Sequence, residues 1–231
     1  MKVAILYSGG KDSNYAVEFA KEKGWEIAYL LSVKPNRTDC YLFHFATVEH
    51  TPLLAKILGL KHHMLECTVA DPKKEAEIVK EFVAAHPVDA VVLGGTGLQE
   101  TQLKSIQEAL RPLHIEAFAA HAGYDHDLIV EDMIKKGYKF MIAQIASDGL
   151  GKDWLGTVLD KDNFDELKLL SMQHGFHIGG EGGYYDTFVL GGPIFDKEIE
   201  VGNFDKNMED ERTGHIVINK ISIAGEKIVN Q

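Results

Sequence analysis

The chain has 231 residues and a formal net charge of -11, from 24 Lys and Arg against 35 Asp and Glu. Hydrophobic residues make up 45 % and charged residues 26 %, which is typical of a globular protein with one large domain or two small ones. The acidic balance argues against a broad nucleic-acid-binding surface and against binding to an anionic membrane, since both favour clustered Lys and Arg.

The two cysteines, Cys40 and Cys67, stand alone in the sequence, without a CxxC spacing. We therefore expect neither a disulfide framework nor a cysteine-based zinc site, and we expect both thiols to be reduced. The first apolar run, residues 3–7, is too short for a signal peptide, and no stretch reaches the about 18 apolar residues of a membrane span. The sequence thus predicts a cytoplasmic protein without a membrane or nucleic-acid partner.

Short apolar runs alternate with amphipathic stretches through the first part of the chain. Residues 3–7 are predicted to form a buried strand, residues 13–23 a helix and residues 26–33 the second strand. Further strands are expected at residues 61–66, 88–93, 115–118 and 140–146, and further helices at 51–58, 73–85, 100–110 and 127–136. Strands that alternate with helices in this way predict βαβ units and a parallel sheet.

The pattern changes after Gly149, where glycine becomes frequent. Strands are expected at residues 187–190, 198–201 and 215–224, with few helices between them. The predicted fold is therefore α/β, with a Rossmann-like parallel sheet that carries helices on both faces and a smaller, strand-rich α/β C-terminal domain. We place the two domains at residues 1–125 and 126–231.

A glycine-rich loop follows the first predicted strand and opens the first helix. It consists of Ser8, Gly9, Gly10, Lys11, Asp12 and Ser13. Glycines bring backbone N–H groups close to a ligand, and a helix N-terminus favours an anion. Asp12 would repel phosphates unless a divalent cation such as Mg²⁺ lay between them. An ordinary capped turn is the alternative, but the carboxyl end of a parallel strand is where ligands bind.

A second glycine-rich stretch, GGEGGYYDT, covers residues 179–187. It places the carboxylate of Glu181 among four glycines, which fits a loop that approaches a ligand closely. A glycine-rich hairpin explains the same residues equally well from local chemistry alone.

Both loops resemble known sequences. SGGKDS resembles the PP-loop of N-type ATP pyrophosphatases, which bind the pyrophosphate of ATP and release AMP and pyrophosphate. GGEGGYYDT, followed by FVLGGP, resembles a loop of diphthine–ammonia ligases, which convert diphthine on elongation factor 2 to diphthamide with ATP and ammonium. RTDCYLFH at residues 37–44 and WLG at residues 154–156 also resemble this family, in collinear order.

The resemblance implies a ligase that activates a carboxylate as an acyl-adenylate for amidation by ammonia, with residues 1–125 binding the nucleotide and residues 126–231 the acceptor. It implies that the PP-loop binds ATP, and the charge of Asp12 beside phosphates is the reason to expect Mg²⁺ there. Gly94 and Gly95 end the fourth predicted strand beside the expected nucleotide crevice, where close approach of a ribose or adenine favours glycine, so we expect them to border the nucleotide; a plain turn is the alternative. Lys11, Asp12 and Glu181 are then the expected catalytic residues. The expected acceptor-binding residues are Asp39, Tyr41, His44, Gly182, Gly183, Tyr185, Asp186 and Thr187.

The chain departs from the family pattern in several places. Tyr184 and Asp186 stand where the family loop has Glu, and GGTGLQETQ at residues 94–102 and AHA at residues 120–122 also differ. A small-molecule carboxylate is therefore an alternative acceptor to modified elongation factor 2. A non-catalytic ATP-binding module is a further alternative, and a tRNA-thiolating enzyme is disfavoured by the missing cysteine pair and basic surface. The oligomeric state stays open, with a homodimer as one option.

Other polar residues have simpler explanations. His62 and His63 would point in opposite directions on a strand and could not share a metal ion. His174 and His177 would share a helical face only if a helix reached that far, which Gly175 disfavours. Glu75, Glu77 and Glu81 are expected on a solvated face of the helix at residues 73–85. His50 is expected to pack locally.

Overall fold

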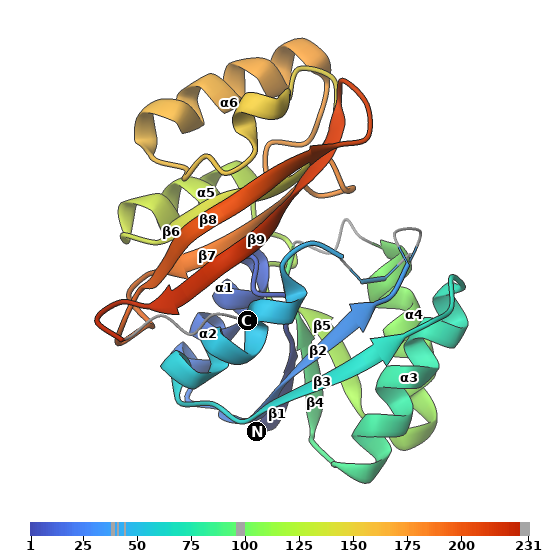
Figure 1. Ribbon diagram of the computed structural model, residues 1–231. Coiled ribbons are helices and arrows are strands. Elements are labelled where there is room, and N and C mark those ends of the chain that lie inside the picture. The colour runs from blue at the N-terminus through green and yellow to red at the C-terminus, as the bar shows by residue number, and fades with distance from the viewer. Residues whose placement is uncertain (38–39, 41, 44, 96–99, 227–231) are drawn as a thin grey trace. The chain divides into compact units, whose positions relative to one another are not determined.

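The computed structural model in Figure 1 describes residues 1–37, 40, 42–43, 45–95 and 100–226. The chain divides into two compact units, Met1–Gly123 and Tyr124–Gln231, which we call unit 1 and unit 2. Each unit has its own sheet among the described residues.

Unit 1 alternates strands and helices in the order that the sequence predicts. Its elements are β1 (Lys2–Leu6), α1 (Lys11–Glu22), β2 (Glu26–Pro35), η1 (Val48–His50), α2 (Thr51–Leu58), β3 (His62–Cys67), α3 (Pro72–Ala85), β4 (Ala90–Leu93), α4 (Glu100–Leu110), η2 (Arg111–Leu113) and β5 (Glu116–Ala119). The strands pair in the order β3-β2-β1-β4-β5, and every described pairing is parallel. The predicted Rossmann-like parallel sheet is thus confirmed.

The strand order reverses between β1 and β4. The chain builds the sheet outward from β1 to β3 and then returns to the other side of β1 with β4. At such a switch point the connections leave the two neighbouring strands in opposite directions, which opens a crevice at their carboxyl ends. The loops that follow Leu6 and Leu93 lie at this crevice.

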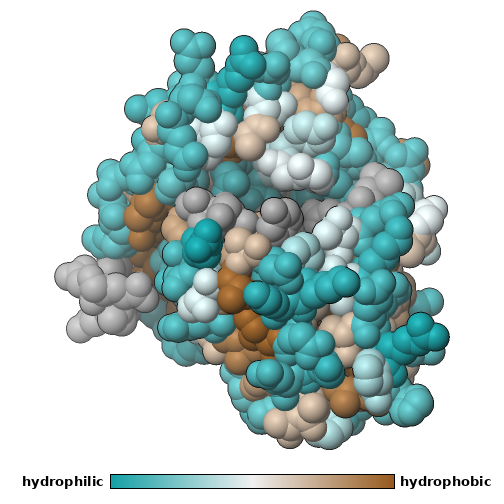
Figure 2. Space-filling model, turned by 90° about the vertical axis from the view of Figure 1, so that its right-hand side faces the viewer, coloured by the Kyte–Doolittle hydropathy of each residue, from teal (hydrophilic) through white to brown (hydrophobic). Residues whose placement is uncertain are grey.

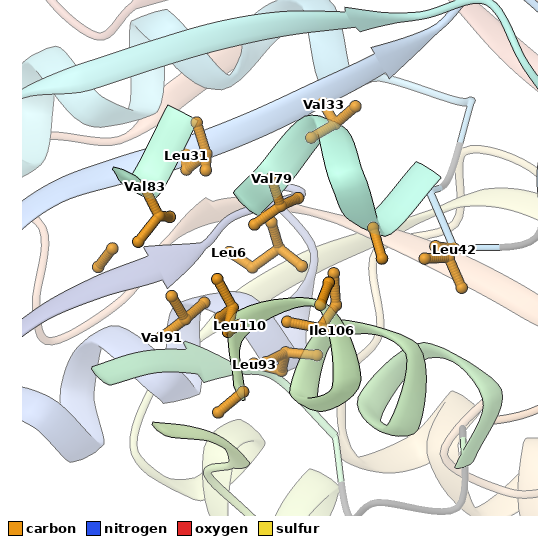
Figure 3. Packing of buried hydrophobic residues seen from close by; sticks show 14 of the residues in the cluster. Leu6, Leu31, Val33, Leu42, Val79, Val83, Val91, Leu93, Ile106 and Leu110 are labelled. Carbon is orange, nitrogen blue, oxygen red and sulfur yellow. The ribbon is translucent and has the colours of Figure 1, made fainter. Parts of the chain in front are cut away.

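Helices cover both faces of the parallel sheet (Figure 1). Figure 3 shows the core on one face, where Val79 and Val83 of α3 and Ile106 of α4 point toward Leu6 of β1. The alternate strand residues, such as Ile5, face the other way and are also fully buried. Burial on both faces explains why the strands are continuous apolar runs.

One prediction on α3 is wrong. Glu75 is not solvated, because its side chain is fully buried, whereas Glu77 and Glu81 are exposed as expected. Glu75 precedes Val79 by four residues and Val83 by eight, so it lies on the inward face of the helix. The backbone N–H of Leu42 donates to the Glu75 carboxylate over 2.7 Å, which compensates part of the cost of burying it.

Unit 2 contains an antiparallel sheet and two α-helices among its described residues. Its elements are α5 (His126–Lys135), β6 (Lys139–Ala146), η3 (Lys152–Trp154), α6 (Lys161–His174), β7 (Tyr185–Gly191), β8 (Ile199–Met208) and β9 (Thr213–Ile223). The strands pair in the order β7-β6-β9-β8. β6 continues the strand–helix alternation of unit 1 in the sequence, but its strand partners are β7 and β9 of this antiparallel sheet. The smaller strand-rich second part is confirmed.

Helix α6 was not predicted from the sequence. Asp160 caps this helix by accepting hydrogen bonds from the N–H groups of Asp162 and Asn163, and the Asn163 side chain accepts from the Asp160 N–H in return. His174 is its last residue and His177 lies beyond it, so these two histidines do not share a helical face.

The face of the molecule in Figure 2 is mainly hydrophilic, and its hydrophobic areas are small and separate. No helix in the described part of the chain is both long enough and apolar enough to cross a membrane.

Candidate active site

The PP-loop turns sharply from β1 into α1, and its own side chains hold that turn. The Ser13 hydroxyl accepts the Gly9 N–H over 3.1 Å and donates to the Gly10 carbonyl over 3.0 Å. The Ser8 hydroxyl lies 3.4 Å from both the Ser13 hydroxyl and the Gly10 nitrogen. Gly10 is the N-cap residue of α1 and has no side chain for capping, so the loop presents backbone N–H groups at the positive end of the helix.

Asn14, which was not predicted as a site residue, supports the PP-loop through hydrogen bonds. Its fully buried side-chain amide donates to the carbonyls of Gly9 and Gly10 over 3.1 and 2.9 Å. Its amide oxygen accepts the Tyr7 hydroxyl over 2.7 Å. Burial raises the pKa of Tyr7, so the phenol stays a neutral donor. The only sequence signal for this role is that Asn14 directly follows the SGGKDS motif.

The carboxylate of Asp12 is the most accessible charge of the loop. One oxygen lies 2.6 Å from the Lys11 ammonium, and the other lies 3.8 Å from Nδ1 of His121. Lys11 and His121 are themselves buried, and the His121 ring lies edge-on to Tyr15. In the sequence His121 is only part of a departure from the family pattern, and its place beside Asp12 was not predicted.

Gly94 brings the end of β4 against this loop. A β-carbon built on Gly94 would lie only 2.6 Å from the carbonyl carbon of Asp12 and 2.7 Å from the nitrogen of Ser13. No side chain fits in that space. Glycine at this position is therefore explained by contact between two backbone segments, and Gly95 continues the same loop with a φ of +87°.

A pocket opens at the switch point of the sheet. Its empty space is about 580 Å³, a figure that includes open solvent at its mouth. Its polar end is formed by Ser8, Asp12 and Ser13, and Gly94 and Gly95 also border it. Its remaining walls are formed mainly by Leu6, Leu31, Val33, Leu42, Phe43, Val48 and Leu93. An apolar wall beside anion-binding groups suits a ligand with both an aromatic ring and phosphates.

The second glycine-rich loop lies in unit 2 and ends at β7. Glu181 is buried in it, with one carboxylate oxygen 3.2 Å from Nδ1 of His126, the first residue of α5. A β-carbon on Gly179 would lie 2.6 Å from two atoms of the His126 ring, so the loop approaches this histidine closely. The His177 ring lies 5.3 Å from the His126 ring. His126 and His177 were not predicted as site residues.

The other predicted residues of this loop differ in exposure. The buried Tyr185 donates its hydroxyl to the Ile178 carbonyl over 2.5 Å and so braces the loop. Thr187 is buried in β7, whereas Asp186 and Gly183 are half-buried and Gly182 is exposed. Asp39, Tyr41 and His44, which were predicted to bind the acceptor, lie outside the described residues.

The histidines of β3 behave as predicted. His62 lies 2.9 Å from the Ser32 hydroxyl and 3.1 Å from the Thr51 hydroxyl, whereas His63 packs against Phe82 on the other side of the strand. Burial and the neighbouring His63 lower the pKa of His62 to about 4. The Ser32 hydroxyl in turn donates to the Tyr7 carbonyl over 2.6 Å, directly before the PP-loop.

Comparison with known sequences identifies the family. Residues 1–116 match the diphthamide synthase N-terminal domain, and residues 125–223 match the diphthamide synthase C-terminal domain. The chain belongs to the diphthamide synthase family. In this diphthamide synthase family member, the boundary between the two compact units, after Gly123, falls within residues 117–124, which separate the two matches.

Relatives across eukaryotes carry the name diphthine–ammonia ligase. The human protein is 26 % identical over 87 % of this chain and 83 % of its own length, and the Danio rerio protein is 27 % identical over 86 % of each. The Schizosaccharomyces pombe protein is 25 % identical over 96 % of this chain but only 39 % of its own length, so the chain spans well under half of that relative. The family resemblance seen in the two loops is confirmed.

Proposed function

We propose that this protein is an ATP-dependent ligase that forms an amide from a carboxylate and ammonia and releases AMP and pyrophosphate. The observation that carries the proposal is the PP-loop at the switch point, where Ser8, Asp12 and Ser13 form the polar end of a pocket with apolar walls. Membership of the diphthamide synthase family supports ATP-dependent amidation in particular.

The loop offers the donors that a pyrophosphate group needs. The Gly9 and Gly10 N–H groups face serine hydroxyls, and phosphate oxygens could take over as their acceptors. Lys11 adds a positive charge at the start of α1, where the helix dipole also favours an anion. The apolar walls of the pocket would hold the adenine ring.

Asp12 would hold Mg²⁺. The residues present fit this ion, because a partly exposed carboxylate beside a phosphate site offers the hard oxygen ligands that Mg²⁺ prefers. When bound, the ion supplies positive charge against the phosphate oxygens.

The reaction would have two steps. An oxygen of the acceptor carboxylate attacks the α-phosphorus of ATP, the bond to the β-phosphate oxygen breaks, and pyrophosphate leaves. Ammonia then attacks the acyl carbon, the bond to AMP breaks, and the amide forms. Glu181 is placed in this scheme as the base that takes a proton from ammonium. Backbone N–H groups stabilise the developing charge, so no covalent enzyme nucleophile is needed.

The acceptor in this proposal is elongation factor 2 carrying diphthine, as the names of the relatives suggest, and the reaction is placed in the cytoplasm. A small-molecule carboxylate is the second candidate, because Tyr184 and Asp186 stand where the family loop has Glu.

The nucleotide products test the proposal. The protein is incubated with ATP, Mg²⁺, ammonium and each candidate acceptor, and AMP, ADP, phosphate and pyrophosphate are measured. Acceptor-dependent formation of equal amounts of AMP and pyrophosphate is expected, and Asp12→Asn is expected to lower its rate on the order of a hundredfold. Glu81→Gln, an exposed carboxylate in the same unit, serves as the control. ADP and phosphate as products would refute the proposed reaction.

A further inference from the structure

Two thiols and a carboxylate converge in unit 1, apart from the residues assigned to catalysis. Cys67 is the last residue of β3, Glu75 lies in the first turn of α3, and Cys40 lies in the segment between β2 and η1. Each offers one potential ligand atom, and these three atoms lie within 4.8 Å of one another. Cys67 and Glu75 are fully buried, and Cys40 is half-buried.

The sheet brings these residues together over long distances in sequence. β2 and β3 are parallel neighbours, and Pro35 at the end of β2 pairs with Cys67. The chain leaves β2 beside Cys67 and then reaches Cys40, while α3 starts a few residues after Cys67. The missing CxxC spacing is therefore no argument against a shared cysteine site, because strand pairing replaces closeness in sequence.

The sulfur atoms have the separation of two ligands on one ion. Sγ of Cys40 and Sγ of Cys67 are 3.9 Å apart. Zinc–sulfur bonds of about 2.3 Å at a tetrahedral angle place two sulfurs roughly 3.8 Å apart. A disulfide would require them to approach to about 2.05 Å. The observed spacing therefore matches shared coordination more closely than it matches a bridge.

Two oxygen donors complete the surroundings of the sulfurs. The Val69 carbonyl oxygen lies 3.3 Å from each sulfur and accepts both thiols. Glu75 accepts the Leu42 N–H over 2.7 Å, and its carboxylate offers an oxygen within 4.8 Å of both sulfurs. The group thus offers two sulfur ligands and one carboxylate oxygen, and a water molecule can complete a tetrahedral set around an ion.

Charge balance also favours a divalent cation. Binding would release the two thiol protons, since thiolates are the metal-binding form. Exchange of two protons for one divalent ion leaves the total charge of the buried group unchanged. Without an ion, the Glu75 carboxylate is a buried negative charge beside two neutral thiols. With a divalent cation bound, that negative charge is paired with a positive one.

We propose that Cys40, Cys67 and Glu75 form a binding site for a thiophilic divalent cation of the zinc type. Cys40 is half-buried, so an ion can reach the site from the surface at this residue. The site has a structural consequence for the neighbouring pocket. Leu42 is bonded to Glu75 through its N–H and lines the switch-point pocket, so a bound ion would stabilise the wall that Leu42 forms.

Cobalt is the probe for the test, because thiolate ligation gives it a charge-transfer absorption. The reduced, metal-free, full-length protein is titrated with Co²⁺ and then with Zn²⁺. We expect one Co²⁺ per chain with this absorption, displaced by Zn²⁺. Cys40→Ser is expected to abolish the absorption, and Glu75→Gln is expected to weaken Co²⁺ binding by about tenfold or more. Asp148→Asn, an exposed carboxylate in unit 2, is the control and is expected to change nothing.

A second measurement avoids dependence on how well the variants fold. In the wild-type protein, Zn²⁺ is expected to protect both thiols from an alkylating reagent, as measured by mass spectrometry of peptides. The site is refuted if the reduced protein gives no thiolate absorption with Co²⁺, if that absorption survives Cys40→Ser, or if Zn²⁺ protects neither thiol. These measurements do not involve ATP, so their outcome does not depend on whether the proposed ligase reaction is correct.

Discussion

Gly94 lies against the backbone of Asp12, so closely that a β-carbon on Gly94 would come within 2.6 Å of the Asp12 carbonyl carbon. The end of β4 and the start of α1 are thereby locked together at the switch point. This contact sets the position of the PP-loop relative to the rest of the pocket in unit 1.

Gly94→Ala is expected to displace the PP-loop, because the neighbouring atoms are backbone and cannot rotate away. We expect a loss of about 1–3 kcal/mol in the free energy of unfolding and weaker ATP binding by about tenfold or more. Chemical denaturation and calorimetric ATP titration measure the two effects. Gly151→Ala is the matched control, since a β-carbon there meets no atom within 4 Å. Equal behaviour of the two variants would contradict the packing account.

Asn14 offers a graded test of how the loop is held. Asn14→Ala removes the hydrogen bonds to Gly9, Gly10 and Tyr7, whereas Tyr7→Phe removes only the last of these. We expect losses of about 2–3 kcal/mol and about 1 kcal/mol in the free energy of unfolding. ATP affinity should fall more for Asn14→Ala than for Tyr7→Phe. The reverse order would mean that the Tyr7 hydroxyl, and not Asn14, is the main support of the loop.

Much of unit 1 could be predicted because the signals there are strong and local. Continuous apolar runs identify strands that are buried on both faces, and SGGKDS identifies the loop between β1 and α1. Glu75 was predicted to be solvated because only its charge was considered. Its position on the helix puts it on the same face as Val79 and Val83. Helix α6 was missed because few of its residues are buried, and Leu169 and Met172 are 60 % and 82 % exposed.

The contacts within the sites depend on tertiary structure and could not be inferred from sequence. His121 comes close to Asp12 only because β5 lies next to β4 in the sheet. His126 comes close to Glu181 only because the glycine-rich loop folds back onto the start of α5. Neither histidine has a sequence neighbour that indicates its partner.

Glu181→Gln is expected to slow ammonium-dependent amide formation on the order of a hundredfold, because glutamine cannot accept a proton from ammonium. ATP binding is expected to stay unchanged, since Glu181 is proposed to act on ammonium and not on the nucleotide. The rate of amide formation and the calorimetric affinity for ATP are measured in parallel. Glu200→Gln, on an exposed position of β8, is the control. An unchanged rate in Glu181→Gln would exclude Glu181 as the base.

His62 predicts a pH dependence of stability. Its pKa is lowered to about 4 in the folded protein, so between about pH 6.5 and pH 4 the unfolded chain binds more protons than the folded one. The free energy of unfolding is therefore expected to fall by about 1–2 kcal/mol as the pH drops through this window. The expected change is smaller than the full pKa shift implies, because His62 is only partly buried and solvent screens its charge. His62→Gln keeps an N–H donor near Ser32 and Thr51 but does not titrate. Denaturation at several pH values should show that the free energy of unfolding of this variant depends less on pH than that of the wild type. An equal dependence on pH in both proteins would mean that groups other than His62 cause it.

The most direct test of the ligase assignment follows the nitrogen atom. The protein is incubated with ATP, isotopically heavy ammonium and elongation factor 2 that carries diphthine, or with a small carboxylate, and the acceptor is analysed by mass spectrometry. We predict that heavy nitrogen enters the acceptor as an amide, one atom for each AMP released. ATP cleavage to AMP without nitrogen transfer to either acceptor, or no ATP-dependent transfer at all, would contradict the assignment.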